Sequence, residues 1–403
     1  MNLLYVADGR SPTTQSWIAN IQRDGHHVSL ISTYPCEKLP DLSEFIILPI
    51  AFSGMAVRKY GTGNTSAYSN PLRGIVKSMH PNLHRLRYLL GPLSLPFYRN
   101  RYLKIVDRIG PELIHALRIP FEGMLAQYAS HKYPLVVSIW GNDLTLHAQR
   151  SYQMGKATQA TLSRADGLMA DAYRDIRLAK SWGFNNAQPS LVVPGCGGID
   201  LEEVERARTP VPEYLVDSIP IGRTLIVNPR GLRPGSLRND VFFDAARMVS
   251  NRHPEVCFLC PTMAGQPEAE RMLKSRALER TVQLLPSLPQ RALWWLFSHA
   301  DVVISPGEHD GVPNSLLEAM ASGCFPIVGD IESLREWITP GVNGLLYPPA
   351  DPVALAESIL LFLDNPDRRF DTARRNQSLI RDRADITSIR KKVTQFYKQV
   401  AGH

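Results

Sequence analysis

With 403 residues, of which 44% are hydrophobic and 21% charged, the chain has an ordinary globular composition, which excludes a disordered protein. Its length predicts two domains, each large enough to bury a core. The formal charge of +7 is moderate and no recognised nucleic-acid-binding module accompanies it, so we expect no nucleic-acid partner.

The start of the chain indicates a cytoplasmic protein. Met1–Gly9 lacks the basic region of a signal peptide and is apolar over only a few residues, so it is predicted to form the first β-strand. No apolar run approaches the ~18 residues that cross a bilayer. The five cysteines are an odd number for a disulfide framework and favour a reducing compartment. Cys257 and Cys260 form C-x-x-C inside an apolar run, which favours a buried strand over a redox or zinc site.

Strand-like and helix-like stretches alternate in the first half of the chain, which is typical of an α/β protein with a parallel sheet. A helix is predicted at Gln15–Arg23. Pro194–Asp200 is predicted to be a flexible break, and the proline-bearing stretch Pro210–Pro220 a linker. The strands predicted before this break are Leu3–Ala7, Val28–Ser32, Phe45–Pro49, Leu113–Ala116, Leu135–Ile139, Gly167–Ala170 and Leu191–Val193.

The alternation restarts after the linker, with strands predicted at Thr224–Asn228, Val256–Cys260, Thr281–Leu285, Val302–Ser305 and Phe325–Val328. We therefore predict two doubly wound, Rossmann-like α/β units that face a central cleft, because open α/β sheets bind ligands at the carboxyl ends of their strands. The predicted domains are residues 1–205 and residues 206–385. Residues 386–403, with an amphipathic helix at Ser388–Val400, are predicted to cross back to the first domain.

Positive charge is concentrated in one segment. From Arg58 to Arg108 there are ten lysines and arginines and a single acid, Asp107. Such a segment attracts phosphates, acidic polymers or anionic lipid, and the alternative is a plain solvated face. We expect it to border the site of an anionic or membrane-bound acceptor, with a peripheral membrane contact.

The segment Asp310–Gly323 carries the strongest chemical pattern. A helix opens near Pro313, and the N–H groups and positive dipole end of such a helix favour a phosphate. The carboxylates of Asp310 and Glu318 are acceptors suited to sugar or ribose hydroxyls. Ser315 and Glu318 also fit a capping box, in which Glu318 bonds to the backbone of Ser315 and holds no ligand. The spacing alone leaves both interpretations open.

A longer pattern surrounds these residues and comprises Ser305–Asp310, Glu318–Gly323, Pro326–Val328, Glu336 and Gly341–Leu346. It resembles the retaining GT-B glycosyltransferases of family 4. Their signature is two acids separated by seven residues, an Ala-Met-Ala-x-Gly helix and a Gly-x-x-Gly-Leu turn. Weaker similarities occur at Asp24–Val28, Trp140–Asp143 and Gly197–Asp200.

The resemblance implies that the second domain binds a nucleotide diphosphate sugar. Glu318 would hold the ribose hydroxyls, and Asp310, as a catalytic residue, would reach hydroxyls of the transferred sugar. Further donor-binding residues expected on this basis are Arg238, His309, Gly311, Val312, Pro313, Asn314, Ser315, Leu317 and Pro286.

Two departures from the family pattern concern the donor. The first acid is usually Glu, whereas this chain has the shorter Asp310. The family usually pairs an Arg with a Lys five residues later to neutralise the diphosphate. Here Arg230 supplies the arginine, the later position is Gly235, and Arg238 is the candidate replacement. The alternative for both arginines is a solvent-exposed loop cation.

In the first domain, the candidate residues follow predicted strands. Gly9, Arg10 and Ser11 join the first strand to the first helix, and their backbone N–H groups are expected to meet the departing phosphate or the acceptor, unless this is an ordinary turn. His115 and Asp143 are catalytic candidates at strand ends. Trp140 belongs with Asp143 to the Trp-Gly-Asn-Asp run, which resembles an acceptor-side loop of the family.

The expected function is therefore retaining transfer of a sugar from a nucleotide diphosphate, UDP rather than GDP, to a hydroxyl acceptor. Glycans, glycolipids and natural-product glycosides are the products considered. We find no Asp-x-Asp pair or cluster with metal-ligand spacing, so no metal and no cofactor are expected. The alternatives are a catalytically silent homologue that binds nucleotide or scaffolds an assembly, and a GT-B sugar-nucleotide epimerase.

Overall fold

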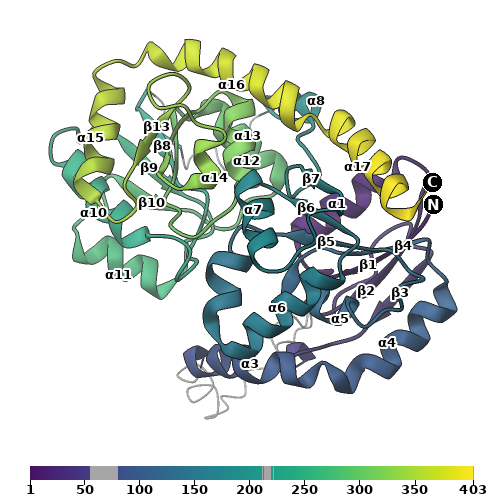
Figure 1. Cartoon of the computed structure of the whole chain (residues 1–403). Coiled ribbons are helices and arrows are strands. Elements are labelled where there is room, and N and C mark those ends of the chain that lie inside the picture. Colours follow the sequence, from purple (N-terminus) through teal and green to yellow (C-terminus); the bar gives the residue numbers. More distant parts are fainter. Residues whose placement is uncertain (55–79, 211, 213–218, 221, 403) are drawn as a thin grey trace, which may run out of the picture. The chain divides into compact units, whose positions relative to one another are not determined.

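The computed structural model describes residues 1–54, 80–210, 212, 219–220 and 222–402, and the chain forms two compact units (Figure 1). Unit 1 consists of Met1–Asp171, Asp175–Val192 and Arg390–His403. Unit 2 consists of Ala172–Arg174 and Val193–Ile389. Unit 2 thus begins before residue 206, because helix α8 (Leu201–Arg206) packs on helices of that unit.

Unit 1 is built on a seven-stranded parallel sheet with strand order β3-β2-β1-β4-β5-β6-β7. Its strands are β1 (Asn2–Ala7), β2 (His27–Ser32), β3 (Glu44–Ile47), β4 (Leu113–Ala116), β5 (Leu135–Ile139), β6 (Gly167–Ala170) and β7 (Ser190–Val192). Its helices are α1 (Pro12–Gln22), α3 (His80–Ser94), α4 (Pro96–Ile109), α5 (Met124–Ala126), α6 (Tyr152–Arg164) and α7 (Tyr173–Ser181). Short helical turns lie at η2 (Ile119–Gly123), η3 (Asp143–His147) and η4 (Ala148–Arg150).

Unit 2 repeats the plan with a six-stranded parallel sheet of order β10-β9-β8-β11-β12-β13. Its strands are β8 (Leu225–Val227), β9 (Cys257–Cys260), β10 (Val282–Leu284), β11 (Val302–Ser305), β12 (Phe325–Gly329) and β13 (Leu345–Tyr347). Besides α8, its helices are α10 (Asn239–Ser250), α11 (Pro267–Ser275), α12 (Gln290–His299), α13 (Asn314–Ser322), α14 (Glu332–Arg335), α15 (Pro352–Leu363) and α16 (Arg368–Ala384). The prediction of two doubly wound parallel sheets is confirmed.

Strand β9 shows how the sheet of unit 2 divides two cores. Successive strand residues point to opposite faces, so Cys257 belongs to one buried apolar cluster and Cys260 to the other. Burial raises the pKa of both thiols. The interpretation of the C-x-x-C pattern as a buried strand is confirmed.

The predicted flexible break at Pro194–Asp200 is instead a turn that backbone hydrogen bonds fix in place. The N–H of Ile199 donates to the carbonyl of Ala384 over 2.7 Å, and the N–H of Ile386 returns a bond to Ile199 over 3.1 Å. Gly198 has φ of 108°, and a Cβ there would lie 2.6 Å from the Cα of Ile386. Only glycine fits this approach. The predicted linker Pro210–Pro220 lies largely outside the described residues.

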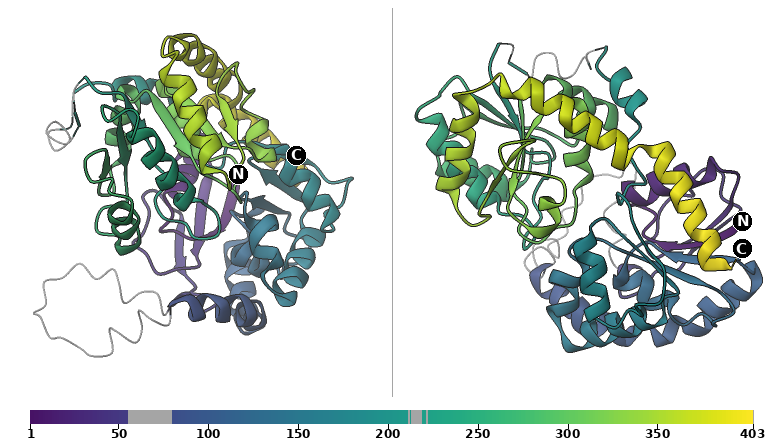
Figure 2. Two further views of the ribbon diagram at one scale, coloured as in Figure 1. Left: turned by 90° about the vertical axis from the view of Figure 1, so that its left-hand side faces the viewer. Right: turned by 45° about the horizontal axis from the view of Figure 1, so that its top comes forward.

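The last helix, α17 (Ile386–Ala401), belongs from Arg390 onward to unit 1 (Figure 2). Arg390 pairs with Asp24 over 2.7 Å, and the Thr394 hydroxyl donates to the same carboxylate over 2.8 Å. The buried hydroxyls of Tyr397 and Tyr5 lie 3.0 Å apart. The C-terminal residues are therefore part of the core of unit 1.

Both sheets reverse their strand order beside the first strand, between β1 and β4 in unit 1 and between β8 and β11 in unit 2. Loops that leave neighbouring strands diverge at such a switch point and leave a crevice at the carboxyl ends of the strands. The candidate residues lie in these loops.

Candidate functional site

The switch point of unit 2 brings Arg230 and Asp310 together. Arg230 follows β8 and Asp310 follows β11, and an Nη of Arg230 donates to Oδ2 of Asp310. The other carboxylate oxygen accepts the N–H of Gly311 over 3.0 Å. The side chain of Arg230 is only 8% exposed, and its buried Nε has no hydrogen-bond partner within the described residues. The ion pair therefore leaves one hydrogen-bond donor, the Nε of Arg230, without a partner among the described residues.

Arg233 adds a second cation to this place. The neighbouring Arg230 guanidinium is the main cause that lowers the pKa of Arg233; burial adds to it and Asp310 opposes it. The exposed Arg233 therefore adds a second positive charge near the Arg230–Asp310 pair. Two such guanidiniums suit a diphosphate.

Arg238 pairs with other residues in this structure, and its predicted role toward the donor stays a prediction. Its guanidinium pairs with Asp240 over 2.7 Å and lies 3.7 Å from Glu308. These carboxylates raise the pKa of Arg238. Arg233, three residues after Arg230, is a second cation near Arg230 that the sequence analysis did not name.

Helix α13 begins beside the Arg230–Asp310 pair. Pro313 is its N-cap residue, and no side chain in the described part of the chain caps it. The first N–H groups of a helix have no partner inside the helix. The capping box of Ser315 and Glu318 is not formed, because the helix starts at Asn314 and Glu318 lies beyond its first turn.

Glu318 is a buried carboxyl on α13. Burial raises its pKa from 4.5 to about 7, and a hydrogen bond from Gln290 of α12 opposes the rise. A carboxyl held in this way gains from a ligand that donates hydrogen bonds to it, as ribose hydroxyls do.

Glu318→Gln should make unfolding less pH-dependent. The unfolded state loses the Glu318 proton near pH 4.5 and the folded state only near pH 7, so folded stability falls as pH rises through this window. The glutamine variant should gain up to about 3 kcal/mol over the parent between pH 4 and pH 8. Denaturant unfolding at both pH values measures this gain. Glu357→Gln, an exposed change on α15, is the control, and an equal difference at both pH values would contradict the buried-carboxyl interpretation.

The other predicted donor residues lie around the same loop in different environments. Leu317 is fully buried in the core and Val312 nearly so. His309, Asn314 and Ser315 are half-buried, and Gly311 and Pro313 are buried. Pro286 is exposed after β10, where its carbonyl accepts the N–H of Thr262 over 3.1 Å.

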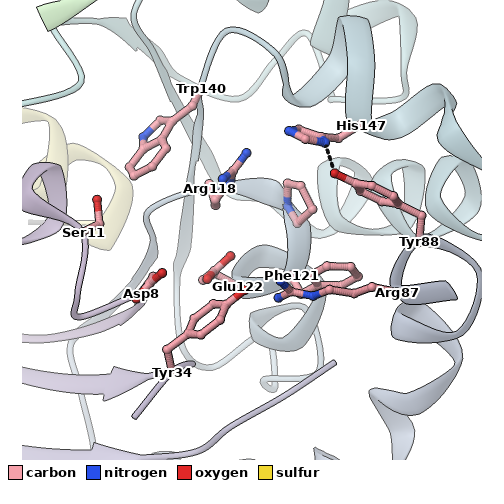
Figure 3. A pocket seen from close by; sticks show the side chains of 11 residues that line it. Asp8, Ser11, Tyr34, Arg87, Tyr88, Arg118, Phe121, Glu122, Trp140 and His147 are labelled. Carbon is pink, nitrogen blue, oxygen red and sulfur yellow. Dashed lines mark hydrogen bonds between the residues drawn. The ribbon is translucent and has the colours of Figure 1, made fainter. Parts of the chain in front are cut away.

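Unit 1 has a pocket of about 270 Å³ at its own switch point (Figure 3). The loops after β1, β2, β4 and β5 contribute to it, together with α3 and η3. The residues that line it are Asp8, Ser11, Tyr34, Arg87, Tyr88, Arg118, Pro120, Phe121, Glu122, Trp140 and His147. Ser11 and Trp140 are the predicted residues among them.

Asp143 lies behind this pocket, which corrects its predicted catalytic role. Its side chain is fully buried, and its Oδ1 accepts from Arg118 over 2.6 Å. Its Oδ2 accepts the N–H groups of Ile119 and Trp140, each over 3.2 Å. Asp143 therefore positions Arg118, which lines the pocket.

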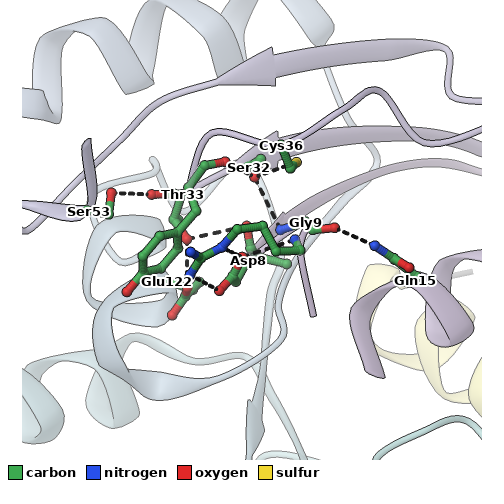
Figure 4. Close-up of polar contacts among 11 residues, drawn as sticks. Asp8, Gly9, Gln15, Ser32, Thr33, Cys36, Ser53 and Glu122 are labelled. Atoms are coloured by element: carbon green, nitrogen blue, oxygen red, sulfur yellow. Dashed lines mark hydrogen bonds and ion pairs between the residues drawn. The ribbon is translucent and has the colours of Figure 1, made fainter. Parts of the chain in front are cut away.

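The loop after β1 is an ordinary turn, which corrects the expectation for its backbone N–H groups (Figure 4). The N–H of Gly9 donates to Ser32 Oγ over 3.1 Å. The N–H groups of Arg10 and Ser11 donate to Asp8, to its side chain over 3.0 Å and to its carbonyl over 3.1 Å. These three backbone N–H groups therefore already have hydrogen-bond acceptors within the protein. The side chains of Asp8 and Ser11 reach the pocket.

His115 is a core residue, which corrects its predicted catalytic role. It is 0% exposed, and its nitrogens lie 2.7 Å from the Tyr397 hydroxyl and 2.8 Å from Ser138 Oγ. Burial lowers the pKa of His115 to about 3. The neutral ring is a structural link between β4, β5 and α17.

Several charged or polar residues of the pocket carry no sequence motif. Arg118 lies two residues after β4 and Tyr34 two residues after β2. The rule that ligands bind at the carboxyl ends of strands beside the switch point would have identified both. Glu122, on η2, and Arg87, on α3, have no such signal.

Two family models match the chain. The model of glycosyl transferases group 1 matches residues 240–378, and the model of glycosyl transferase 4-like proteins matches residues 82–172.

Curated relatives match over shorter stretches. D-inositol 3-phosphate glycosyltransferase of Corynebacterium urealyticum is 28% identical over 141 residues, 33% of each chain. Amylovoran biosynthesis glycosyltransferase AmsK of Erwinia amylovora is 31% identical over 109 residues, 25% of this chain and 27% of that protein. The matched part spans about a third or less of the length of these relatives.

Solved structures match over the whole chain. The complex of Anabaena HepE with UDP has a TM-score of 0.69 at 14% identity and covers 99% of this chain and 100% of that chain. Sucrose-phosphate synthase from Thermosynechococcus elongatus has a TM-score of 0.71 at 15% identity and covers 99% of both chains. The two doubly wound sheets thus have the GT-B fold. The two family matches add support for a glycosyltransferase of the GT4-like type.

The described residues offer neither a membrane-spanning helix nor a group of metal ligands. None of their helices is both long and apolar enough to cross a membrane. Nor do they contain three or more His, Cys, Asp or Glu side chains grouped as metal ligands.

Proposed function

We propose that this protein is a retaining glycosyltransferase that moves a sugar from a nucleoside diphosphate to a hydroxyl acceptor. The observation that carries the proposal is the nearly buried Arg230 paired with Asp310 at the switch point of unit 2, with the positive charge of Arg233 beside it. A diphosphate supplies negative charge to match these guanidiniums. The family matches support the same reaction class.

Each donor group has a counterpart in unit 2. Arg230, Arg233 and the first N–H groups of α13 would hold the diphosphate, and Glu318 would accept the ribose hydroxyls. Negative charge grows on the diphosphate as the sugar leaves, so fixed guanidiniums stabilise the transition state more than the ground state. A phosphate oxygen of the leaving group can take the acceptor proton, so no protein nucleophile is required.

Uridine is the proposed base, with no metal ion or other cofactor required. HepE, which shares the fold, has been solved with UDP and with UDP-glucose. The absence of an Asp-x-Asp pair in the sequence favours a metal-independent reaction. We retain the cytoplasm as the proposed location.

The test combines nucleotide binding with product analysis. The full chain should bind UDP and transfer or hydrolyse a labelled UDP-sugar in EDTA, and NMR should show that the product keeps the anomeric configuration of the donor. Glu318→Ala should raise the Kd for UDP about tenfold, because it removes an acceptor for hydroxyl donors, whereas the exposed Glu357→Ala should not.

Each other result identifies an alternative. Inversion would contradict the retaining mechanism, and loss of activity in EDTA would contradict metal independence. Tight UDP binding without transfer or hydrolysis would favour a catalytically silent homologue. Conversion of the nucleotide sugar into its epimer would favour an epimerase.

A further inference from the structure

The pocket of unit 1 contains two arginines with unused hydrogen-bonding capacity. Arg87 and Arg118 both line it, and the Nε of each is buried without a partner in the ranges that the structure describes. Arg118 is paired with Asp143. Arg87 has no ion pair among the described residues, and of the two carboxylates that line the pocket Asp8 is paired with Arg10.

Arg87 is held by aromatic rings. Its guanidinium carbon lies 5.1 Å from the ring centre of Tyr34 and 4.8 Å from that of Phe121 (Figure 3). These contacts orient the guanidinium at the pocket wall before any ligand arrives. A planar, oriented fork of donors binds a phosphate or carboxylate through paired hydrogen bonds.

Glu122 provides a different group at the same pocket. It is 3% exposed, and its Oε1 accepts from the Thr33 hydroxyl over 2.7 Å (Figure 4). Its Oε2 has no partner in the described part of the protein. A buried, unpartnered carboxyl oxygen on a pocket wall is a site for a hydroxyl donor. Burial raises the pKa of Glu122, and Arg118 opposes the rise.

The rest of the pocket wall and the volume of the pocket limit the size of the ligand that it can hold. The phenol ring of Tyr34 and the indole of Trp140 offer apolar surface. The volume of about 270 Å³ is near the lower end of small-molecule sites. A group no larger than a monosaccharide or a short polyol fits such a space.

We propose that this pocket holds the acceptor, and that the acceptor carries an anionic group, a phosphate or a carboxylate, close to the hydroxyl that receives the sugar. Arg87 and Arg118 bind the anion, and Glu122 accepts the hydrogen bond of a hydroxyl. This inference rests on the proposed function, because it assigns the second substrate to unit 1 once the donor is assigned to unit 2.

The test measures binding to the full chain by calorimetry, in the presence of saturating UDP. The probes are inorganic phosphate, glycerol 3-phosphate, glycerate and glycerol. Glycerol 3-phosphate or glycerate should bind at least about tenfold more tightly than glycerol, since the arginines contact the charge. Whichever of the two binds more tightly identifies the anion as a phosphate or a carboxylate.

Variants assign the contacts. Arg87→Gln should weaken the preferred anionic probe about tenfold or more, and Arg87→Lys less, because lysine keeps the charge but loses the fork. Arg101→Gln, an exposed change on α4, is the matched control. Glu122→Gln should weaken the hydroxyl-bearing anion and leave inorganic phosphate unchanged. Retained thermal unfolding checks that each variant is folded.

The inference is overturned if glycerol binds as well as the anions, if no anion binds, or if Arg87→Gln and Arg87→Lys bind like the parent. Binding of the probe only when UDP is left out would also overturn it, because the site would then be the donor's. Failure of UDP itself to bind would overturn the proposed function. The two failures are thus distinguishable.

Discussion

Arg230→Gln should lower kcat for sugar transfer about a hundredfold to a thousandfold, which is the loss seen when one oriented donor to a developing negative charge is removed. Arg230 is nearly buried, paired with Asp310 and left with an unpartnered Nε in the described structure. Its guanidinium is therefore already oriented when the diphosphate binds. Initial rates with a labelled nucleotide sugar measure the effect.

The matched control for this change is Arg238→Gln. Arg238 lies on the same loop but is paired with Asp240 and Glu308. Arg238→Gln should therefore change kcat less than threefold when it is measured by the same initial rates. If Arg230→Gln is unstable, Arg230→Lys keeps a charge at this place and should retain intermediate activity. Equal rates for parent, Arg230→Gln and Arg230→Lys would remove Arg230 from the mechanism.

Asp310→Asn should lower kcat/KM about a hundredfold while the affinity for UDP stays within a few-fold of the parent. The change keeps the shape of the side chain and removes its charge. A carboxylate that contacts the transferred sugar in the transition state contributes to the rate and not to the binding of a nucleotide without sugar. Steady-state kinetics and calorimetry with UDP give the two quantities.

The structure defines what a different result would mean. Asp310 accepts a hydrogen bond from Arg230, so a large loss of UDP affinity would show that it acts by holding that guanidinium. Unchanged activity would mean that Asp310 has no role. Glu308→Gln is then the informative variant, because Glu308 is the other acid of this loop and lies 3.7 Å from the half-exposed Arg238.

The strands were predictable because a parallel sheet covered on both faces requires short apolar runs between helices. β4, β5, β6 and β11 have the predicted bounds. The short strand β13 was not predicted, since Leu345–Tyr347 lies in a turn-rich stretch without a clear run.

The site was less predictable, because direction and partners depend on packing. Ile114 and Ala116 belong to the core cluster on one face of the sheet of unit 1, so His115 between them points to the other face, where Tyr397 covers it. Arg233 stands near Arg230 only because of how the loop after β8 folds. Neither fact can be read from spacing, whereas the motif Asp310–Gly323 was recognisable as a contiguous pattern.

Helix α17 has a consequence for how the protein is made. Tyr5 and its partner Tyr397 are separated in the sequence by residues 193–389 of unit 2, so Tyr397 is synthesised only after them. Unit 1 therefore lacks part of its interior until the residues after Ile389 have been made, although most of its sequence is synthesised before unit 2. A fragment cut between residues 192 and 193 would likewise lack the part of α17 that belongs to unit 1. Completion of the first unit depends on synthesis of the second.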